Sequence, residues 1–198
     1  MGFIMWEREV LGTSIYYIVH WFLIYSFFGW VSESIYMSIC NRKLTNRGFM
    51  FGPFCPIYGV GALCVYFILR PFASNILTLY VIGALLATAF EYIVAILMQK
   101  VFGDVWWDYN DKPFNYKGIL CLESTLAWGL YTVVMFRFLH EIVMGIVSKY
   151  SYQRGIILGT VVIVIMALDL SIQIAREKRE LLNSGVDTIR GKIKGIRS

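Results

Sequence analysis

Five apolar stretches, each roughly 20 residues long, alternate with polar connections along the chain. About 20 residues of α-helix cross the hydrocarbon layer of a bilayer, so each stretch is long enough to form a transmembrane helix. The pattern therefore predicts an all-α fold, a membrane helix bundle with about five transmembrane helices. The stretches cover residues 13–39, 49–69, 76–98, 119–136 and 155–175.

Two segments depart from this simple alternation. The second stretch opens with Pro53 and Pro56, and proline lacks the backbone N–H that an interior helical residue donates. Proline in the first turn starts a helix well, so we expect this stretch to enter the membrane as a loop and to become helical near Pro56. Residues 137–149 have amphipathic helical spacing, and this segment either lies along the interface or extends the fourth span.

Composition agrees with a membrane protein. Apolar and aromatic residues make up 58% of the chain and charged residues 16%, whereas a soluble domain carries about 25% charged residues. This excludes a soluble enzyme and a disordered regulator. The net charge of +5 does not indicate nucleic-acid binding, because the basic residues cluster at the ends of the apolar stretches.

The same basic residues indicate the orientation of the spans. With the N-terminus outside and the C-terminus inside, 13 of the 18 Lys and Arg residues lie on the cytoplasmic side. The chain then divides into a four-span domain (1–150), a fifth span (151–175) and a basic, amphipathic cytoplasmic tail (176–198). The tail is either a helix on the anionic inner leaflet or a frayed segment. Its apolar stripe comprises Leu182, Val186, Ile189, Ile193 and Ile196.

The first four spans show signs of an internal duplication. Glu33 is followed nine residues later by Arg42, and Glu91 is followed nine residues later by Lys100. The loop after each of these two spans ends in a basic residue followed by a glycine. Eleven residues after that glycine stands a second glycine, which is preceded by an aromatic residue. These pairs are Arg47-Gly48 with Tyr58-Gly59, and Lys117-Gly118 with Trp128-Gly129. Spans 1–2 and 3–4 are therefore predicted to be parallel copies of one helix–loop–helix unit.

Acidic residues inside the spans are the clearest candidates for chemistry. A carboxylate at the centre of a transmembrane helix costs about 2.5–3.5 kcal/mol on insertion scales, so it should face a partner or a polar cavity. Glu33 and Glu91 are the foremost candidates. Glu123 lies in the first turns of the fourth span, where the helix dipole alone favours an acid. Asp169 lies near the end of the fifth span and is expected to pair with Arg176.

The loop between the third and fourth spans carries the run Trp106-Trp107-Asp108-Tyr109 and, further on, Asn115. Such aromatic residues either anchor a loop at the membrane interface or fold back as a lid over the bundle. Together with the acids, this loop completes the predicted set of substrate- or ion-binding residues. The set comprises Glu33, Glu91, Glu123, Trp107, Asp108, Tyr58 and Asn115.

The sequence predicts neither a metal site nor a cofactor. His20 and His140 are the only histidines and lie in different spans, which is too few ligands for a zinc or haem site. No GxxxxGK[ST] motif occurs, so the chain cannot hydrolyse ATP by a P-loop mechanism. GxSxG and HExxH motifs are also absent, and we expect that the chain is not an enzyme.

Four blocks of sequence resemble one known family. They are FGWVSES (28–34), NRGFMFGPFCPIYG (46–59), FGDVWWDY (102–109) and PFNYKG (113–118). These blocks are similar to bacterial membrane proteins catalogued as putative ABC-transporter type IV permeases, over residues 16–131, with the fifth span and the tail outside. The resemblance implies a multi-pass protein of the bacterial cytoplasmic (inner) membrane.

The leading hypothesis is a small permease or permease component, with intramembrane carboxylates lining a polar cavity. Its expected partners are the lipid bilayer, a separate ATPase subunit and a second copy of the chain, and nucleic acid is not among them. One alternative is a non-transporting binding or regulatory protein that holds a lipid or a partner. Another is an intramembrane enzyme that uses a carboxylate pair on a lipid. Carboxylates paired to Arg or Trp in a plugged groove favour the regulatory alternative.

Overall fold

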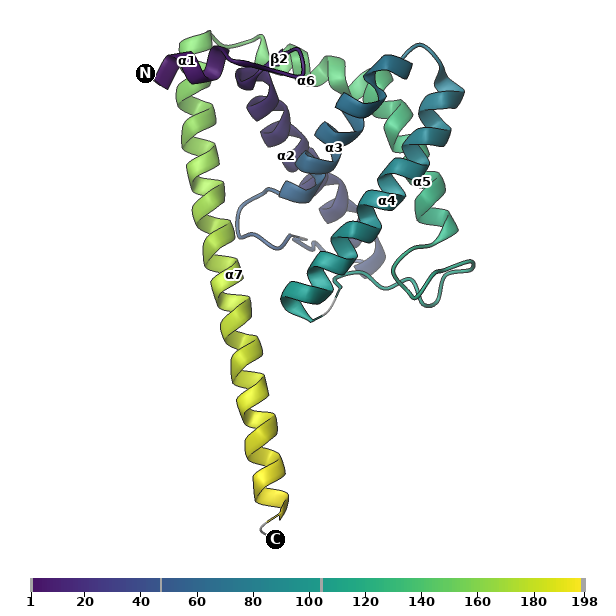
Figure 1. Cartoon of the computed structure of the whole chain (residues 1–198), viewed down its shortest axis with the longest axis vertical. Coiled ribbons are helices and arrows are strands. Elements are labelled where there is room, and N and C mark those ends of the chain that lie inside the picture. Colours follow the sequence, from purple (N-terminus) through teal and green to yellow (C-terminus); the bar gives the residue numbers. More distant parts are fainter. Residues whose placement is uncertain (1, 47, 104, 197–198) are drawn as a thin grey trace.

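The computed structural model describes the backbone of residues 2–46, 48–103 and 105–196 and, within these ranges, the side chains of residues 5–180. Within these residues the fold is helical, with one short hairpin near the N-terminus (Figure 1). The elements are α1 (Gly2–Glu7), β1 (Glu9–Val10), β2 (Thr13–Ser14), α2 (Ile15–Asn41), α3 (Pro56–Leu69), η1 (Arg70–Phe72), α4 (Ile76–Phe102), α5 (Leu122–Val134), η2 (Met135–Leu139), α6 (His140–Val147) and α7 (Tyr152–Ile196).

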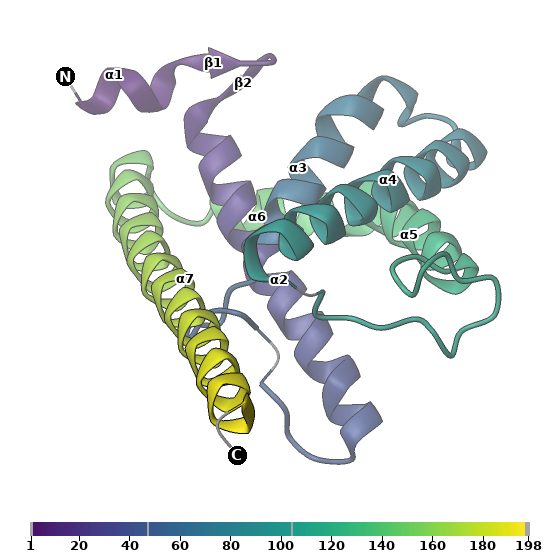
Figure 2. The ribbon, with the colours of Figure 1, turned by 60° about the horizontal axis from the view of Figure 1, so that its bottom comes forward.

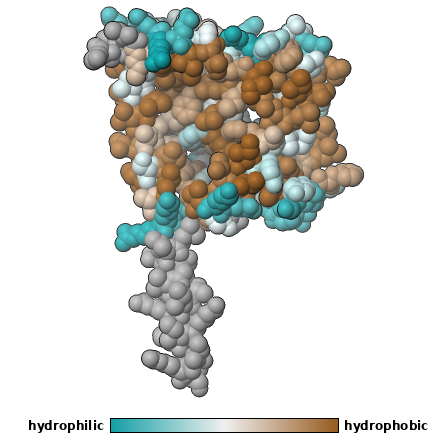
Figure 3. Space-filling model, in the orientation of Figure 1, coloured by the Kyte–Doolittle hydropathy of each residue, from teal (hydrophilic) through white to brown (hydrophobic). Residues whose placement is uncertain are grey.

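Helices α2, α3, α4, α5 and α7 run up and down in alternation, which confirms the predicted all-α membrane bundle (Figure 1). Four segments are long and apolar enough to cross a membrane, namely Ile15–Asn41, Ile76–Phe102, Leu122–Val147 and Tyr152–Glu180. Figure 3 shows the matching surface, an apolar belt between two hydrophilic ends. The chain is therefore a multi-pass membrane protein.

The helix of the second predicted span is too short to cross the membrane by itself. As expected, its helix α3 begins at Pro56, with Cys55 as the N-cap, and it has 14 residues. At 1.5 Å per residue this helix is about 21 Å long, less than the roughly 30 Å of the hydrocarbon layer. The loop before Pro56 supplies the remaining depth, because its prolines prevent an earlier helical start.

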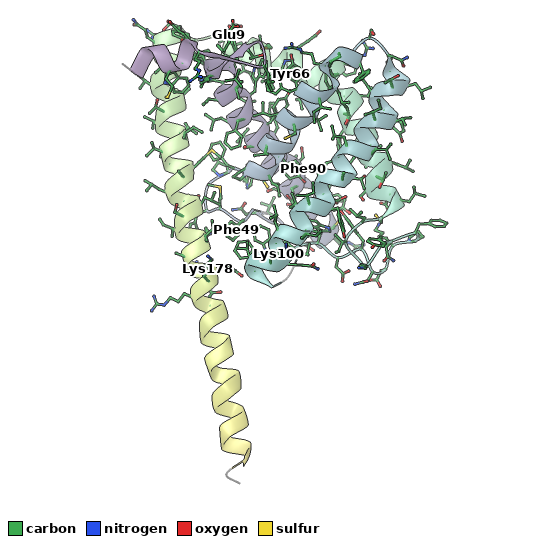
Figure 4. All side chains as sticks on the ribbon, viewed as in Figure 1. Glu9, Phe49, Tyr66, Phe90, Lys100 and Lys178 are labelled. Carbon is green, nitrogen blue, oxygen red and sulfur yellow. The ribbon has the colours of Figure 1, made fainter. Side chains whose placement is uncertain are left out.

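The fourth span continues without a break through η2, a π-helical turn, into α6. Residues 137–147 thus extend the fourth span and residues 148–149 form a turn. Beyond the π turn, α6 crosses the top of the bundle towards α2 (Figures 1 and 2). Val143 and Val147 are almost completely buried there. His140 Nδ1 lies 3.0 Å from the Tyr25 hydroxyl, and its ring stacks on Tyr66, which Figure 4 labels.

Two pairs of helices pack closely through glycines. An added Cβ on Gly59 of α3 would lie 2.6 Å from the carbonyl oxygen of Phe22 in α2. An added Cβ on Gly129 of α5 would lie 2.9 Å from the carbonyl oxygen of Tyr80 in α4. In both pairs the second helix contacts the backbone of the first, which a side chain at these positions would prevent.

Helix α7 lies at the edge of the bundle beside α2 and is attached by polar contacts at two places in its membrane-spanning part (Figures 1 and 2). At the upper end, His20 Nε2 lies 3.2 Å from the carbonyl oxygen of Gly155. At the lower end, Asp169 accepts hydrogen bonds from the backbone N–H groups of Phe51 (3.1 Å) and Gly52 (2.8 Å). Asp169 therefore fixes α7 to the loop before α3.

The expected pairing of Asp169 with Arg176 is wrong, because Arg176 pairs with Glu180 one turn further along α7. The carboxylate of Asp169 is instead used by the loop, whose backbone N–H groups have no helical partners at that point. The apolar stripe of the tail begins at Leu182, outside the described side chains, so its binding to the inner leaflet stays a prediction.

Candidate functional site

Glu91 is a buried carboxylate in the middle of α4, next to Phe90, which Figure 4 labels at mid-height of the bundle. Its side chain is held by three donors. The Tyr109 hydroxyl donates to Oε1 at 3.0 Å. The Trp128 indole N–H donates to Oε2 at 3.0 Å, and the Ser124 hydroxyl lies 3.4 Å from the same oxygen. Both carboxylate oxygens are thus occupied by groups from α5 and from the loop before it.

The donors to Glu91 are all neutral, and among the described residues no Lys or Arg forms an ion pair with it. A second source of stabilisation is the start of α5. Ser124 is the third residue of that helix, where the aligned peptide dipoles leave a partial positive charge. A carboxylate with 8% of its surface exposed is therefore tolerated here without a basic partner.

The loop between α4 and α5 folds back on itself and carries Tyr109 towards Glu91. The Trp107 indole N–H donates to the carbonyl oxygen of Ile119 at 2.8 Å. The backbone N–H of Tyr109 donates to the carbonyl oxygen of Gly118 at 2.9 Å, and Gly118 has the positive φ of 66° that glycine adopts without strain. Of the two arrangements expected for the aromatic run, this is the lid over the bundle.

Burial raises the pKa of the Tyr109 phenol above its ordinary value, and the charge of Glu91 and the hydrogen bond to it raise this pKa further. The phenol is the donor in that bond, so it must stay protonated for the lid to hold. The pKa of this phenol is higher in the folded protein than in the unfolded chain. The protonated phenol therefore stabilises the folded state fully below about pH 10, and this stabilisation is lost as the pH rises through the pKa of the folded protein.

We therefore expect the bond between Tyr109 and Glu91 to persist through the neutral range and to fail only in strong alkali. In an ultraviolet titration of phenolate formation, Tyr109→Phe should remove one tyrosine from the most alkaline phase and leave the phase near the ordinary tyrosine pKa of about 10 unchanged. Loss of a tyrosine from that ordinary phase would contradict the buried, hydrogen-bonded placement of this phenol.

Glu33 lies on the other side of an aromatic pair from Glu91. The rings of Tyr58 and Trp128 have centroids 6.4 Å apart. Trp128 binds Glu91, while Tyr58 interacts electrostatically with both Glu33 and Tyr109. The Cys55 thiol, at the start of α3, lies 4.0 Å from Glu33 Oε2. The structure thus brings together three of the predicted site residues, Glu33, Tyr58 and Glu91.

The other four predicted residues lie away from this group. Glu123 is exposed and forms a 2.8 Å ion pair with Lys112, whose pKa it raises through the hydrogen bond and its charge. Such surface pairs contribute little to stability. The hydrogen bonds of the remaining three stay within the loop: Trp107 with Ile119, Asp108 with Asn110, and Asn115 with Asn110, Lys112 and Gly118. These three shape the lid rather than contact Glu91.

Three residues that the predicted set lacks complete the site: Tyr109, Ser124 and Trp128. Ser124 and Trp128 are four residues apart in α5, and so they share one face of the helix. That spacing is the sequence signal that could have found the pair. The contact of Tyr109 has no such signal, because it depends on how the loop folds. Among the described residues, no group of three His, Cys, Asp or Glu side chains could hold a metal ion.

The alternating helices, the apolar belt and the buried acid define a polytopic helical membrane protein with a polar interior site. A family model described as putative ABC-transporter type IV matches residues 20–174, and the chain belongs to this family. The match extends beyond residue 131, where the resemblance noted from the sequence ends, and includes most of the membrane part of α7. Comparisons with curated proteins and with solved structures give no match. The family description indicates a transport-related membrane component.

Proposed function

We propose that the chain is a permease, or the membrane-embedded component of one, in the bacterial cytoplasmic membrane. Glu91 is its central binding group for a proton or a cationic substrate, and the loop carrying Tyr109 is the gate. The supporting observation is the buried Glu91 carboxylate, whose donors are neutral and come partly from a loop. When the loop withdraws, Oε1 loses its donor and becomes available to a ligand.

Two like-oriented halves are part of this proposal. Glu33 and Glu91 are 58 positions apart, as are Phe22 and Tyr80, whose carbonyl oxygens face the packing glycines Gly59 and Gly129. Those glycines are 70 positions apart, as are Tyr58 and Trp128, which lie beside the two acids. The same helix contact and the same aromatic neighbour thus recur in both halves, which supports the duplication and a site at its centre.

Energy coupling in this proposal comes from outside the chain. The sequence has no P-loop motif, while the family description names an ABC-type transporter. A separate ATPase subunit is therefore the proposed partner, bound on the cytoplasmic side, where the lid loop and the loop before α3 lie together. Their contact is the stacked pair Phe49 and Trp106, with ring centroids 4.6 Å apart. We also propose that the working unit contains two copies of the chain.

One observation favours the regulatory alternative, in which the chain binds a partner but transports nothing. Both oxygens of Glu91 are already occupied by Tyr109, Ser124 and Trp128. A carboxylate with a permanent set of internal donors stabilises a structure and needs no ligand. The two functions differ in whether the site around Glu91 ever opens to both sides of the membrane.

Cysteine accessibility at position 124 tests this difference without knowledge of the substrate. Ser124→Cys, in a chain whose four native cysteines are replaced by serine, is reconstituted in oriented vesicles. A membrane-impermeant thiol reagent is then added to one side or to the other. A permease should react from both sides, because its site faces each side in turn. Reaction from one side only, or from neither, would support the regulatory function and contradict transport.

A matched control is available on the same helix. Leu126 lies two residues further along α5, with 48% of its surface exposed at the apolar belt. Leu126→Cys should stay unreactive from both sides, since the reagent does not enter lipid. Equal reaction of both cysteines would mean that reactivity on α5 does not report the opening of the site around Glu91, and it would contradict the proposed permease.

A further inference from the structure

An apolar groove of about 340 Å³ lies on the bundle between α7 and α2. It lies between the two polar attachments of α7. At its edge, Leu23 packs together with Met50 and Met166. The walls are formed mainly by Leu23, Ile24, Phe27 and Phe28 of α2 and by Leu158 and Val162 of α7.

The position of the groove along the helices places it in one leaflet. Its α2 wall extends from His20 to Phe28, which is about 12 Å at 1.5 Å per residue. This wall begins five residues after α2 starts at Ile15, and Leu158 lies six residues after α7 starts at Tyr152. The hydrocarbon layer of one leaflet is about 15 Å thick. The groove therefore lies in the leaflet at the α1 end of the bundle.

The chemistry of the walls excludes a polar occupant. The lining has two polar side chains, His20 and Tyr150. The ring nitrogens of His20 already face the carbonyl oxygens of Tyr16 (2.7 Å) and Gly155 (3.2 Å), which leaves at most the Tyr150 hydroxyl for an occupant. Water needs two to four polar partners, so it gains nothing by entering. A peptide segment would bring backbone groups that find no hydrogen bonds there.

The length of the groove argues against a helix from a second copy of the chain. Such a helix would contact the 12 Å of this groove over about two turns, and this contact is far smaller than the roughly 800 Å² per partner that a stable interface buries. The groove has about 340 Å³. An occupant must therefore be slender, apolar along its whole length and already present in the leaflet.

We propose that the groove binds one alkyl chain of a membrane lipid, which enters from the leaflet at the α1 end and lies between α2 and α7. The alkyl chain fills a space that neither water nor protein fills, and it adds apolar contacts between α7 and the four-helix bundle. It also contacts Phe54, which lines the groove one residue before Cys55 and α3. This binding is independent of whether the protein transports a substrate.

Native mass spectrometry of protein extracted from nanodiscs of phosphatidylethanolamine and phosphatidylglycerol tests the proposal. The wild-type chain should retain one phospholipid under detergent conditions that strip the remaining lipid. Val162→Trp fills the groove from α7 and should reduce this retention at least tenfold. Val161→Trp is the matched control: its neighbouring position is half exposed at the apolar belt, and the variant should retain lipid as the wild type does.

Ile24→Trp fills the groove from the α2 wall and repeats the test if Val162→Trp does not fold. The proposal is overturned if the wild type retains no lipid, or if a folded variant with a filled groove retains as much as the wild type. A wild-type dimer that dissociates in Val162→Trp would also overturn it, because the occupant would then be a second copy of the chain.

Discussion

Tyr109→Phe is expected to raise the reactivity of a cysteine at position 124 by about ten- to a hundredfold, because the lid opens more often. The substitution removes the hydroxyl that donates to Glu91 and keeps the ring that fills the same space. A hydrogen bond to a charged group contributes about 1.5–3 kcal/mol, and each 1.4 kcal/mol changes an equilibrium about tenfold. The fraction of molecules with the lid withdrawn should increase accordingly, as measured by the rate of reaction with a thiol reagent added on the side of the lid loop.

The same loop provides the control. Tyr116 has 51% of its surface exposed, and among the described residues its hydroxyl forms no hydrogen bond. Tyr116→Phe should leave the reaction rate of the cysteine introduced at position 124 close to that of the parent, since no bond that closes the lid is lost. If both variants behave like the parent, Tyr109 does not hold the lid closed, and the proposed gate is wrong.

Gly59→Val is expected to remove most of the folded protein. The new side chain would meet the Phe22 carbonyl oxygen 2.6 Å from its Cβ, together with the Ser26 hydroxyl in even closer contact. A backbone atom cannot swing aside as a side-chain tip does, so α3 must move away from α2. Overpacking in a core costs about 1–3 kcal/mol, and here the loss of the helix contact adds to it. The measurements are the yield of folded protein in detergent and its melting temperature.

Gly145→Val separates this effect from the general effect of a β-branched residue in a helix. Gly145 lies in α6, and an added Cβ there would meet nothing within 4 Å. Its melting temperature should remain close to that of the parent, because valine has a slightly better helix propensity than glycine. Equal losses in the two variants would show that close packing of α2 and α3 does not account for the sensitivity of position 59.

The helices could be predicted from the sequence because each depends on a local property. The apolar length predicts the spans, and the prolines predict a helical start at Pro56. The sequence leaves the course of 137–149 open, since amphipathic spacing does not distinguish an interfacial helix from a span that bends. What decides it is the packing of Val143 and Val147 against the core, which involves residues far away in the sequence.

The site could be predicted only in part, for a similar reason. Glu91 and Glu33 are conspicuous as acids in apolar stretches, and the structure places them on either side of one aromatic pair. Glu123 also lies in an apolar stretch, but its side chain faces outwards. Successive side chains of an α-helix point about 100° apart, and Ser124 is the neighbour that points towards Glu91. The partner Tyr109 comes from a loop whose course depends on hydrogen bonds such as the one from Trp107 to Ile119.

The π-helical turn between α5 and α6 has a consequence for how these two regions communicate. A π turn holds one more residue than the α-helical geometry would, and one residue corresponds to a rotation of about 100°. Conversion of Met135–Leu139 to regular α-helix would therefore rotate α6 about its axis and move Val143 out of its buried position. Trp128, which donates to Glu91 from α5, lies about two turns before this point. A rotation of α5 near Glu91 would therefore be coupled to a rotation of α6 at the far surface of the bundle.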